Sequence, residues 1–167
     1  MASTTDQNFE QLGYGGNVPS QHVGAGRKII GDAVATRTLL AKESGALCLM
    51  DAAAGTVYTL PVITSANVGM FFDFHQTVTV TSNSSKVITG SAAQFILGQV
   101  QIMIAASATT LAAAFNGSTH VAITSNGSTT GGVIGSRFRL EAISTTQWLI
   151  TGFVCGTGSI ATPAATS

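Results

Sequence analysis

From residue 28 onward, apolar and polar residues alternate in short runs whose length is typical of β-strands. The clearest run is 70–80, where the even positions are apolar except for Gln76 and the odd positions are polar except for Phe71. A period of two predicts a strand with one face in the core and the other face toward solvent. Eleven strands are predicted in this way, at 28–30, 34–41, 46–51, 56–60, 69–82, 86–89, 95–105, 111–115, 119–124, 132–143 and 147–155.

Turn signals separate these segments. Asn116-Gly117 and Asn126-Gly127 are hairpin sequences, because both central residues of a type I′ turn need a positive φ. No long window repeats with the 3.6-residue period of a helix. We therefore expect an all-β fold: a single β-sandwich with jelly-roll-like topology over residues 28–155.

The two ends of the chain lack this pattern. Residues 1–27 contain many glycines and little periodicity, so we expect an extended N-terminal arm that forms no core element of its own. The first residues carry no basic and apolar stretch of the kind found in signal peptides. Residues 156–167 are predicted to be a C-terminal tail.

The last predicted strand breaks the alternation. Trp148, Ile150 and Val154 share one face, whereas Leu149 and Phe153 lie on the other face. A strand that is apolar on both faces is covered twice, and another subunit is a natural second cover. This strand predicts an oligomer.

Charge is unusually scarce. Charged residues make up 8% of the 167 positions and the net charge is zero, whereas soluble domains carry about 25%. Nine of the fourteen charges precede residue 52, and none lies between Val87 and Ser136. Because phosphate binding needs a basic face, this balance excludes an ordinary nucleic-acid-binding protein. The composition instead favours a protein that works within an assembly.

The uncharged segment 95–115 is long enough to cross a bilayer. Gln99 and Gln101 interrupt its hydrophobicity, however, and alternate with apolar residues as in a strand. We therefore expect buried strands here and no membrane span.

No pattern of catalytic, cofactor-binding or metal-binding residues emerges. The sequence has no phosphate-binding loop and no nucleophile elbow, and its histidines are isolated from one another. Asp73 and His75 share one strand face, and we interpret them as a solvated or interfacial polar pair. We expect no enzyme activity, no cofactor and no metal.

Two cysteines, Cys48 and Cys155, are too few for a disulfide scaffold. Two separate thiols are the favoured interpretation, and a single bridge between them stays open.

Candidate partner contacts are charged or aromatic side chains. Arg137 and Arg139 could bind an acidic patch on a partner or could pair with Glu141, and the residue pattern leaves both open. Trp148 is more typical of a core anchor than of a ligand-stacking residue. The candidates are Arg27, Lys28, Phe71, Arg137, Arg139, Trp148 and Phe153.

Three segments resemble virion proteins of tailed bacteriophages. They are 44–61, which ends in Thr59-Leu60-Pro61, the aromatic strand 69–74, and the tryptophan strand 146–152 that continues into 156–158. The pattern is similar to that of head decoration, or cement, proteins. This resemblance implies a non-enzymatic homo-trimer, made in the host cytoplasm, that binds the major capsid protein on the exterior of the virion and stabilises it.

Two other structural roles stay open. The chain could be a receptor-binding or structural module of a tail fibre, with Phe71, Gln76 and Trp148 around a sugar pocket. It could also be the coat protein of a small virus. That third role usually requires a basic arm, and residues 1–26 contain no lysine or arginine.

Overall fold

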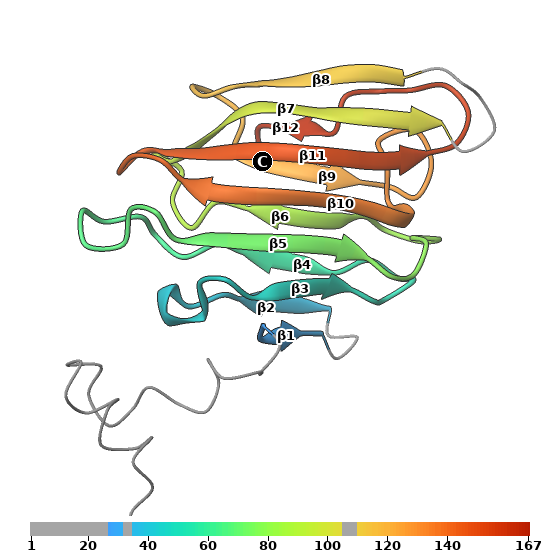
Figure 1. Ribbon diagram of the computed structural model, residues 1–167. Coiled ribbons are helices and arrows are strands. Elements are labelled where there is room, and N and C mark those ends of the chain that lie inside the picture. The colour runs from blue at the N-terminus through green and yellow to red at the C-terminus, as the bar shows by residue number, and fades with distance from the viewer. Residues whose placement is uncertain (1–26, 32–34, 105–109) are drawn as a thin grey trace, which may run out of the picture.

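The computed structural model describes residues 27–31, 35–104 and 110–167, which form two β-sheets (Figure 1). The seven-stranded sheet has the order β1 (Ile29–Ile30), β3 (Leu47–Met50), β5 (Phe71–Gln76), β10 (Val133–Ala142), β11 (Gln147–Gly156), β7 (Phe95–Ile104) and β8 (Thr110–Asn116). The five-stranded sheet has the order β12 (Ala164–Ala165), β9 (Ala122–Ser125), β6 (Ser85–Ile88), β4 (Val57–Thr59) and β2 (Thr36–Thr38). A short 3-10 helix, η1 (Ala41–Glu43), precedes β3. The predicted all-β class is confirmed.

The chain alternates between the two sheets from β1 to β7. Each odd-numbered strand of this part lies in the seven-stranded sheet and each even-numbered strand lies in the other. Because the chain crosses between sheets after every strand, successive strands of one sheet run in the same direction. Accordingly β1, β3 and β5 pair in parallel, as do β2, β4 and β6.

The hairpin of β10 and β11 lies between β5 and β7. β10 pairs with β5 antiparallel, and β11 pairs with β7 in parallel over ten residue pairs. Jelly rolls are built from antiparallel strands, so the parallel pairs of this chain differ from the topology that the sequence pattern suggested. The spacing of turns predicts where strands end, but it does not specify which strands become neighbours.

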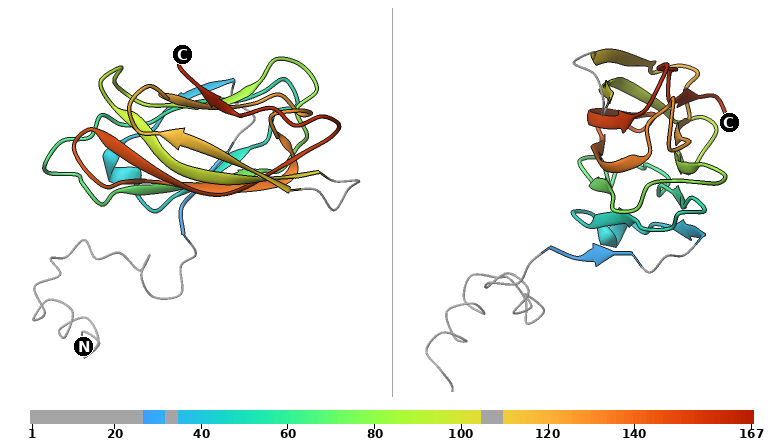
Figure 2. Two further views of the ribbon diagram at one scale, coloured as in Figure 1. Left: turned by 90° about the horizontal axis from the view of Figure 1, so that it is seen from above. Right: turned by 90° about the vertical axis from the view of Figure 1, so that its right-hand side faces the viewer.

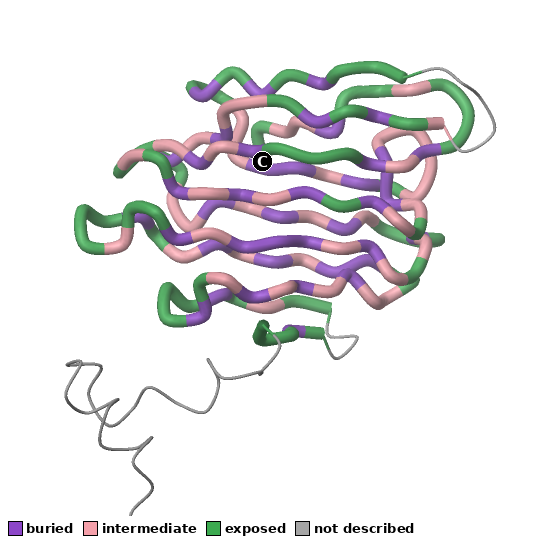
Figure 3. Tube along the Cα trace, in the orientation of Figure 1, coloured by how far each residue is buried: buried purple, intermediate pink, exposed green. Residues whose placement is uncertain are grey.

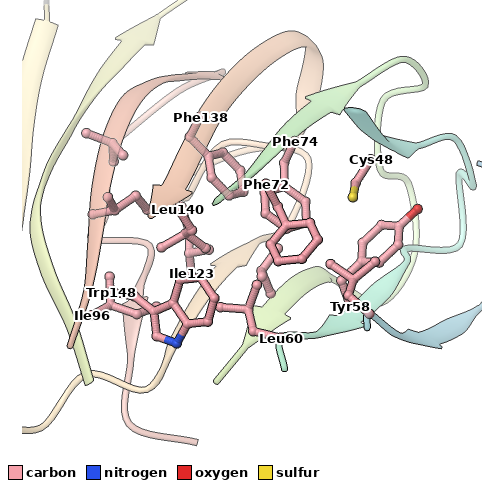
Figure 4. Packing of buried hydrophobic residues seen from close by; sticks show 14 of the residues in the cluster. Cys48, Tyr58, Leu60, Phe72, Phe74, Ile96, Ile123, Phe138, Leu140 and Trp148 are labelled. Atoms are coloured by element: carbon pink, nitrogen blue, oxygen red, sulfur yellow. The ribbon is translucent and has the colours of Figure 1, made fainter. Parts of the chain in front are cut away.

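The core lies between the two sheets, which form separate layers when viewed from the side (Figure 2). Phe74 stacks on Phe138 with ring centroids 5.2 Å apart, and Tyr58 meets the edge of Phe74 at 5.6 Å (Figure 4). Burial alternates along β10 from Ser136 to Ala142 (Figure 3), as expected for a strand with one face in the core. β5 follows the same pattern except at Asp73, which is also buried. The even positions predicted to be apolar therefore build this core.

Gln76 is the one polar residue among the even positions of 70–80. It is buried, and its side-chain amide donates a hydrogen bond of 3.0 Å to the carbonyl of Met50. Buried amides need such partners, so a polar residue fits at this core position. β5 ends here, and the predicted strand 69–82 was therefore too long.

The two predicted terminal segments have different outcomes. Residues 1–26 of the predicted arm lie outside the described residues, and only Arg27 is placed. Residues 156–167 are not simply a tail. Ala164 and Ala165 form β12, which pairs with β9, and Ala164 packs against the core. Among the described residues, no helix is long and apolar enough to cross a membrane.

Candidate interaction surface

The outward face of the seven-stranded sheet carries the odd-numbered side chains of its central strands. Strand register arranges them in three rows that cross β5, β10, β11 and β7. The central row is Asp73, Arg139, Thr151 and Gln99. The Glu141 row is Phe71, Glu141, Leu149 and Leu97. The Arg137 row is His75, Arg137, Phe153 and Gln101.

Asp73 is the centre of an ion cluster on this face. Its carboxylate receives two hydrogen bonds from Arg139, of 2.9 and 2.8 Å, and forms an ion pair of 2.6 Å with Arg27. The Asp73 side chain is only 3% exposed, whereas the two arginines are 35% and 42% exposed. Two guanidinium groups therefore cover a buried carboxylate and shield it from water.

The cluster also shifts the pKa values of Asp73 and Arg139. Hydrogen bonds from Arg139, opposed by burial and assisted by Arg27, lower the pKa of Asp73. The same hydrogen bonds raise the pKa of Arg139. Arg139 lies over the ring of Phe71 at 4.4 Å, within the range of a cation–π contact. The Arg139 side chain is thus held by both of its β5 neighbours.

Arg27 also anchors the point where residues 1–26 join the described chain. Its guanidinium donates to the carbonyl of Gly45 at 3.0 and 2.8 Å and to that of Ala46 at 3.0 Å. These bonds add to its ion pair with Asp73. One exposed arginine therefore joins the start of the described chain to the segment before β3 and to β5.

A second ion cluster lies beside this anchor. Glu43 accepts a hydrogen bond of 2.7 Å from Lys28 and one of 2.9 Å from Arg37, and its other carboxylate oxygen accepts from the backbone of Leu40. Burial alone would raise the pKa of Glu43, but these bonds lower it to about 2. Adjacent residues Arg27 and Lys28 are thus each tied to a buried carboxylate.

The other half of the face is uncharged. Thr151 and Phe153 of β11 are exposed, as are Gln99, Gln101 and Met103 of β7. Aromatic and methionine side chains at the surface are typical of protein contacts, and amides add hydrogen bonds without the desolvation cost of a charge. This half has the composition of a protein interface.

The structure separates the predicted partner contacts into three groups. Trp148 is fully buried and packs beside Phe72, so it is corrected from a partner contact to the core anchor that its strand context favours. Its indole Nε1 has no hydrogen-bond partner among the described residues. Burial removes both Trp148 and Gln76, which is 1% exposed, from the sugar pocket considered for a tail-fibre module.

In the second group, Arg27, Lys28 and Arg139 are engaged in ion pairs within the chain. The third group consists of residues that remain available to contact a partner. Arg137 and Phe153 are exposed and directly opposite each other on β10 and β11. Phe71 is half-buried beneath Arg139. Leu149, which the sequence pattern placed on the second apolar face of its strand, lies on this surface beside Leu97. Leu97 is the surface residue that the sequence interpretation missed, although its odd position in an apolar strand was the available signal.

Reactive chemistry is sparse on the described residues. They contain no group of three or more histidine, cysteine or acidic side chains that could hold a metal. Asp73 pairs with arginines and not with His75. Cys48 and Cys155 are both free thiols, so the bridge that the sequence left open does not form.

Comparisons with protein-family models, curated protein sequences and solved structures found no match. The functional argument therefore rests on the surface itself.

Proposed function

We propose that this chain is a structural virion protein that binds the outside of a phage capsid and stabilises it by bridging neighbouring major-capsid subunits. The anchor at Arg27 is the observation that carries this proposal. In this role, residues 1–26 reach over a neighbouring capsid subunit while the two-sheet domain rests on another.

The anchor supports bridging because residues 1–26 can hold a neighbouring capsid subunit only if they are firmly attached to the two-sheet domain. Arg27 combines an ion pair to a buried carboxylate with hydrogen bonds to two carbonyls, and Lys28 adds a bond to Glu43. Because the Arg27 and Lys28 side chains are 35% and 56% exposed, screening by water limits each of these bonds to about 1 kcal/mol or less, and the anchor depends on several of them acting together. A pull on residues 1–26 would pass through this anchor into β3 and β5 without unravelling β1.

Length and charge fit the same role. Twenty-six residues span at most about 90 Å when fully extended, which exceeds the width of a domain of this size. Residues 1–26 contain no lysine or arginine, so their contacts would be with protein and not with a genome. The scarcity of charge also makes the contacts of the domain less sensitive to salt.

The proposal includes a more specific form of the all-β fold. The two facing sheets form a β-sandwich with an N-terminal arm, in which the alternating crossovers replace part of the jelly-roll strand order. The resemblance to decoration proteins implies a homo-trimer. Any closed oligomer would strengthen attachment, because several weak contacts made together raise the apparent affinity.

The test begins with location. Particles purified from a lysate that contains this chain are labelled with a gold-conjugated antibody to it and imaged by electron microscopy. We expect label over the outside of the heads. Label at the tail tips would instead favour a tail-fibre module. Label that appears only after the shell is broken open, or no label on particles, would overturn the proposal.

The anchor is tested separately with heads that lack the protein. A variant without residues 2–26 and the variant Arg27→Gln are each mixed with such heads, and occupancy is measured after sedimentation. We expect both to bind at least tenfold more weakly than the full chain. Lys42→Gln, an exposed change in η1, is the matched control. Undiminished occupancy of the shortened chain would remove residues 1–26 from the mechanism.

A further inference from the structure

We propose that two copies of this chain pair face to face through the outward face of their seven-stranded sheets, around a two-fold axis that follows the central row. This pairing does not depend on capsid binding. It follows from the way charges and apolar side chains are placed on the three rows.

The first observation is a pair of opposite charges on β10. Arg137 and Glu141 lie on the same face, on either side of Arg139. Alternate residues of a strand are about 6.7 Å apart, so the two charges are separated by about 13 Å and do not pair within one chain. Among the described residues neither one forms an ion pair. The charge of Glu141 acts on Arg139 at longer range, but the hydrogen bonds of Arg139 go to Asp73.

The second observation is that these charges are symmetric about the central row. A two-fold axis lying between two facing sheets and perpendicular to their strands reverses the strand direction but keeps β10 over β10. Arg137 of each copy then faces Glu141 of the other. Such an interface is isologous, so the same ion pair forms twice. An axis parallel to the strands would leave both charges without a partner, which selects the perpendicular one.

The apolar residues obey the same symmetry. Reversing β11 about Thr151 places Phe153 of one copy over Leu149 of the other, again twice. Phe153 is 38% exposed in the single chain, so the pairing would remove much of its apolar surface from water. On β7, Gln101 would lie over Leu97, and its amide would reach the polar rim.

The central row permits close approach at the axis. Arg139 would meet its own copy there, but its guanidinium is already held by Asp73 and lies over Phe71. The like charges are therefore neutralised and turned toward β5. Thr151 and Gln99, which complete the row, are uncharged and able to hydrogen-bond across the axis. Facing sheets pack about 10 Å apart, a spacing that these side chains fill.

Charge reversal tests the pairing directly. The molar mass of the full chain, and of Arg137→Glu, Glu141→Arg and the double variant, is measured by light scattering and sedimentation equilibrium. We expect the wild type to have twice the 16.9 kDa of one chain. Each single reversal places like charges together twice and should weaken association by about a hundredfold. The double variant exchanges the two charges and should restore the dimer.

Lys42→Glu reverses an exposed charge in η1, outside the three rows, and is the matched control. Circular dichroism verifies that every variant is folded. A wild-type monomer would overturn the proposal. A trimer would also overturn it and would favour the homo-trimer that the resemblance implies. Reversals without effect, or a double variant that remains monomeric, would show that the copies do not meet through β10. If a monomeric variant still bound capsids, the dimer and the proposed capsid-binding function would be shown to be independent of each other.

Discussion

Arg139 donates two nearly equal hydrogen bonds to Asp73, one to each carboxylate oxygen, although the two residues are 66 positions apart in the chain. The bonds join β10 to β5 on the outward face of the sheet. The planar guanidinium matches the carboxylate in this geometry, which a lysine could not reproduce. The ion pair with Arg27 then connects the same carboxylate to the start of the described chain.

Asp73→Asn should destabilise the protein. The amide keeps the shape of the carboxylate but removes the charge that both arginines need, and it directs an N–H group at one of them. We expect the free energy of unfolding to fall by about 2 kcal/mol, less than for a fully buried pair because the arginines are partly exposed. Urea denaturation at pH 7 measures the change. Lys42→Gln should lie within about 0.5 kcal/mol of the wild type, and an equally stable Asp73→Asn would show that the cluster contributes nothing.

Acid should destabilise the fold over a defined pH range. The pKa of Glu43 is lowered in the folded state from 4.5 to about 2, so its stabilising effect is complete above its unfolded pKa. That effect is lost as the pH falls from about 5 toward 2, and the lowered pKa of Asp73 acts in the same direction. Because Lys28 is 56% exposed, we expect screening by water to limit the contribution of Glu43 to about 2 kcal/mol.

Urea midpoints measured at several pH values between 7 and 2.5 check this dependence. Glu43→Gln should be less stable than the wild type at pH 7 and should lose less stability on acidification. The same slope in both proteins would exclude Glu43 as the source of the pH dependence.

Gly98→Ala should weaken the contact between β7 and β11. Gly98 has a φ of +119°, and a Cβ at this position would lie 2.5 Å from the carbonyl oxygen of Ile150. Gly135 has a φ of +96° with no atom within 4 Å of an added Cβ, which makes Gly135→Ala a matched control. We expect losses of about 3 kcal/mol at Gly98 and about 1 kcal/mol at Gly135, measured by thermal unfolding. Equal losses would show that backbone strain alone, and not the clash, determines the effect.

The two cysteines should differ in reactivity. Burial, with the charge of Glu43 nearby, raises the pKa of Cys48 to about 12, so almost no thiolate forms at pH 8. Cys155 is only partly buried. Iodoacetamide should therefore label Cys155 in the native protein and Cys48 only after unfolding, as read by mass spectrometry. Cys155→Ser should remain unlabelled in the native state, and rapid labelling of that variant would contradict the burial of Cys48.

The sequence pattern predicts the strands far better than their arrangement. Each predicted segment overlaps a strand of the structure, because alternation reports directly which side chains face the core. Alternation does not report which strand lies alongside, so the parallel pairs and the place of the β10–β11 hairpin were not foreseen. β12 was missed because Ala164 and Ala165 have no periodicity and become a strand only by pairing with β9.

The candidate surface was predictable only in part. Arg137 and Phe153 could be identified from residue type and position, and both are exposed. Arg139 and Arg27 were equally plausible from residue type, but their ion pairs with Asp73 depend on contacts between residues far apart in the chain. For Trp148 the strand context already favoured a core anchor over a binding residue, and its complete burial agrees with that interpretation.

The position of the β10–β11 hairpin also determines the order in which this protein is able to fold. β7 is synthesised more than forty residues before β11, yet β11 is the strand that joins it to the rest of the seven-stranded sheet. Until the hairpin inserts, β5 and β7 each expose an unpaired edge of backbone groups. Such long-range closure slows folding, and open edges invite pairing with other nascent chains. Fast synthesis at high concentration would therefore make insertion of this hairpin the step at which folding and aggregation compete.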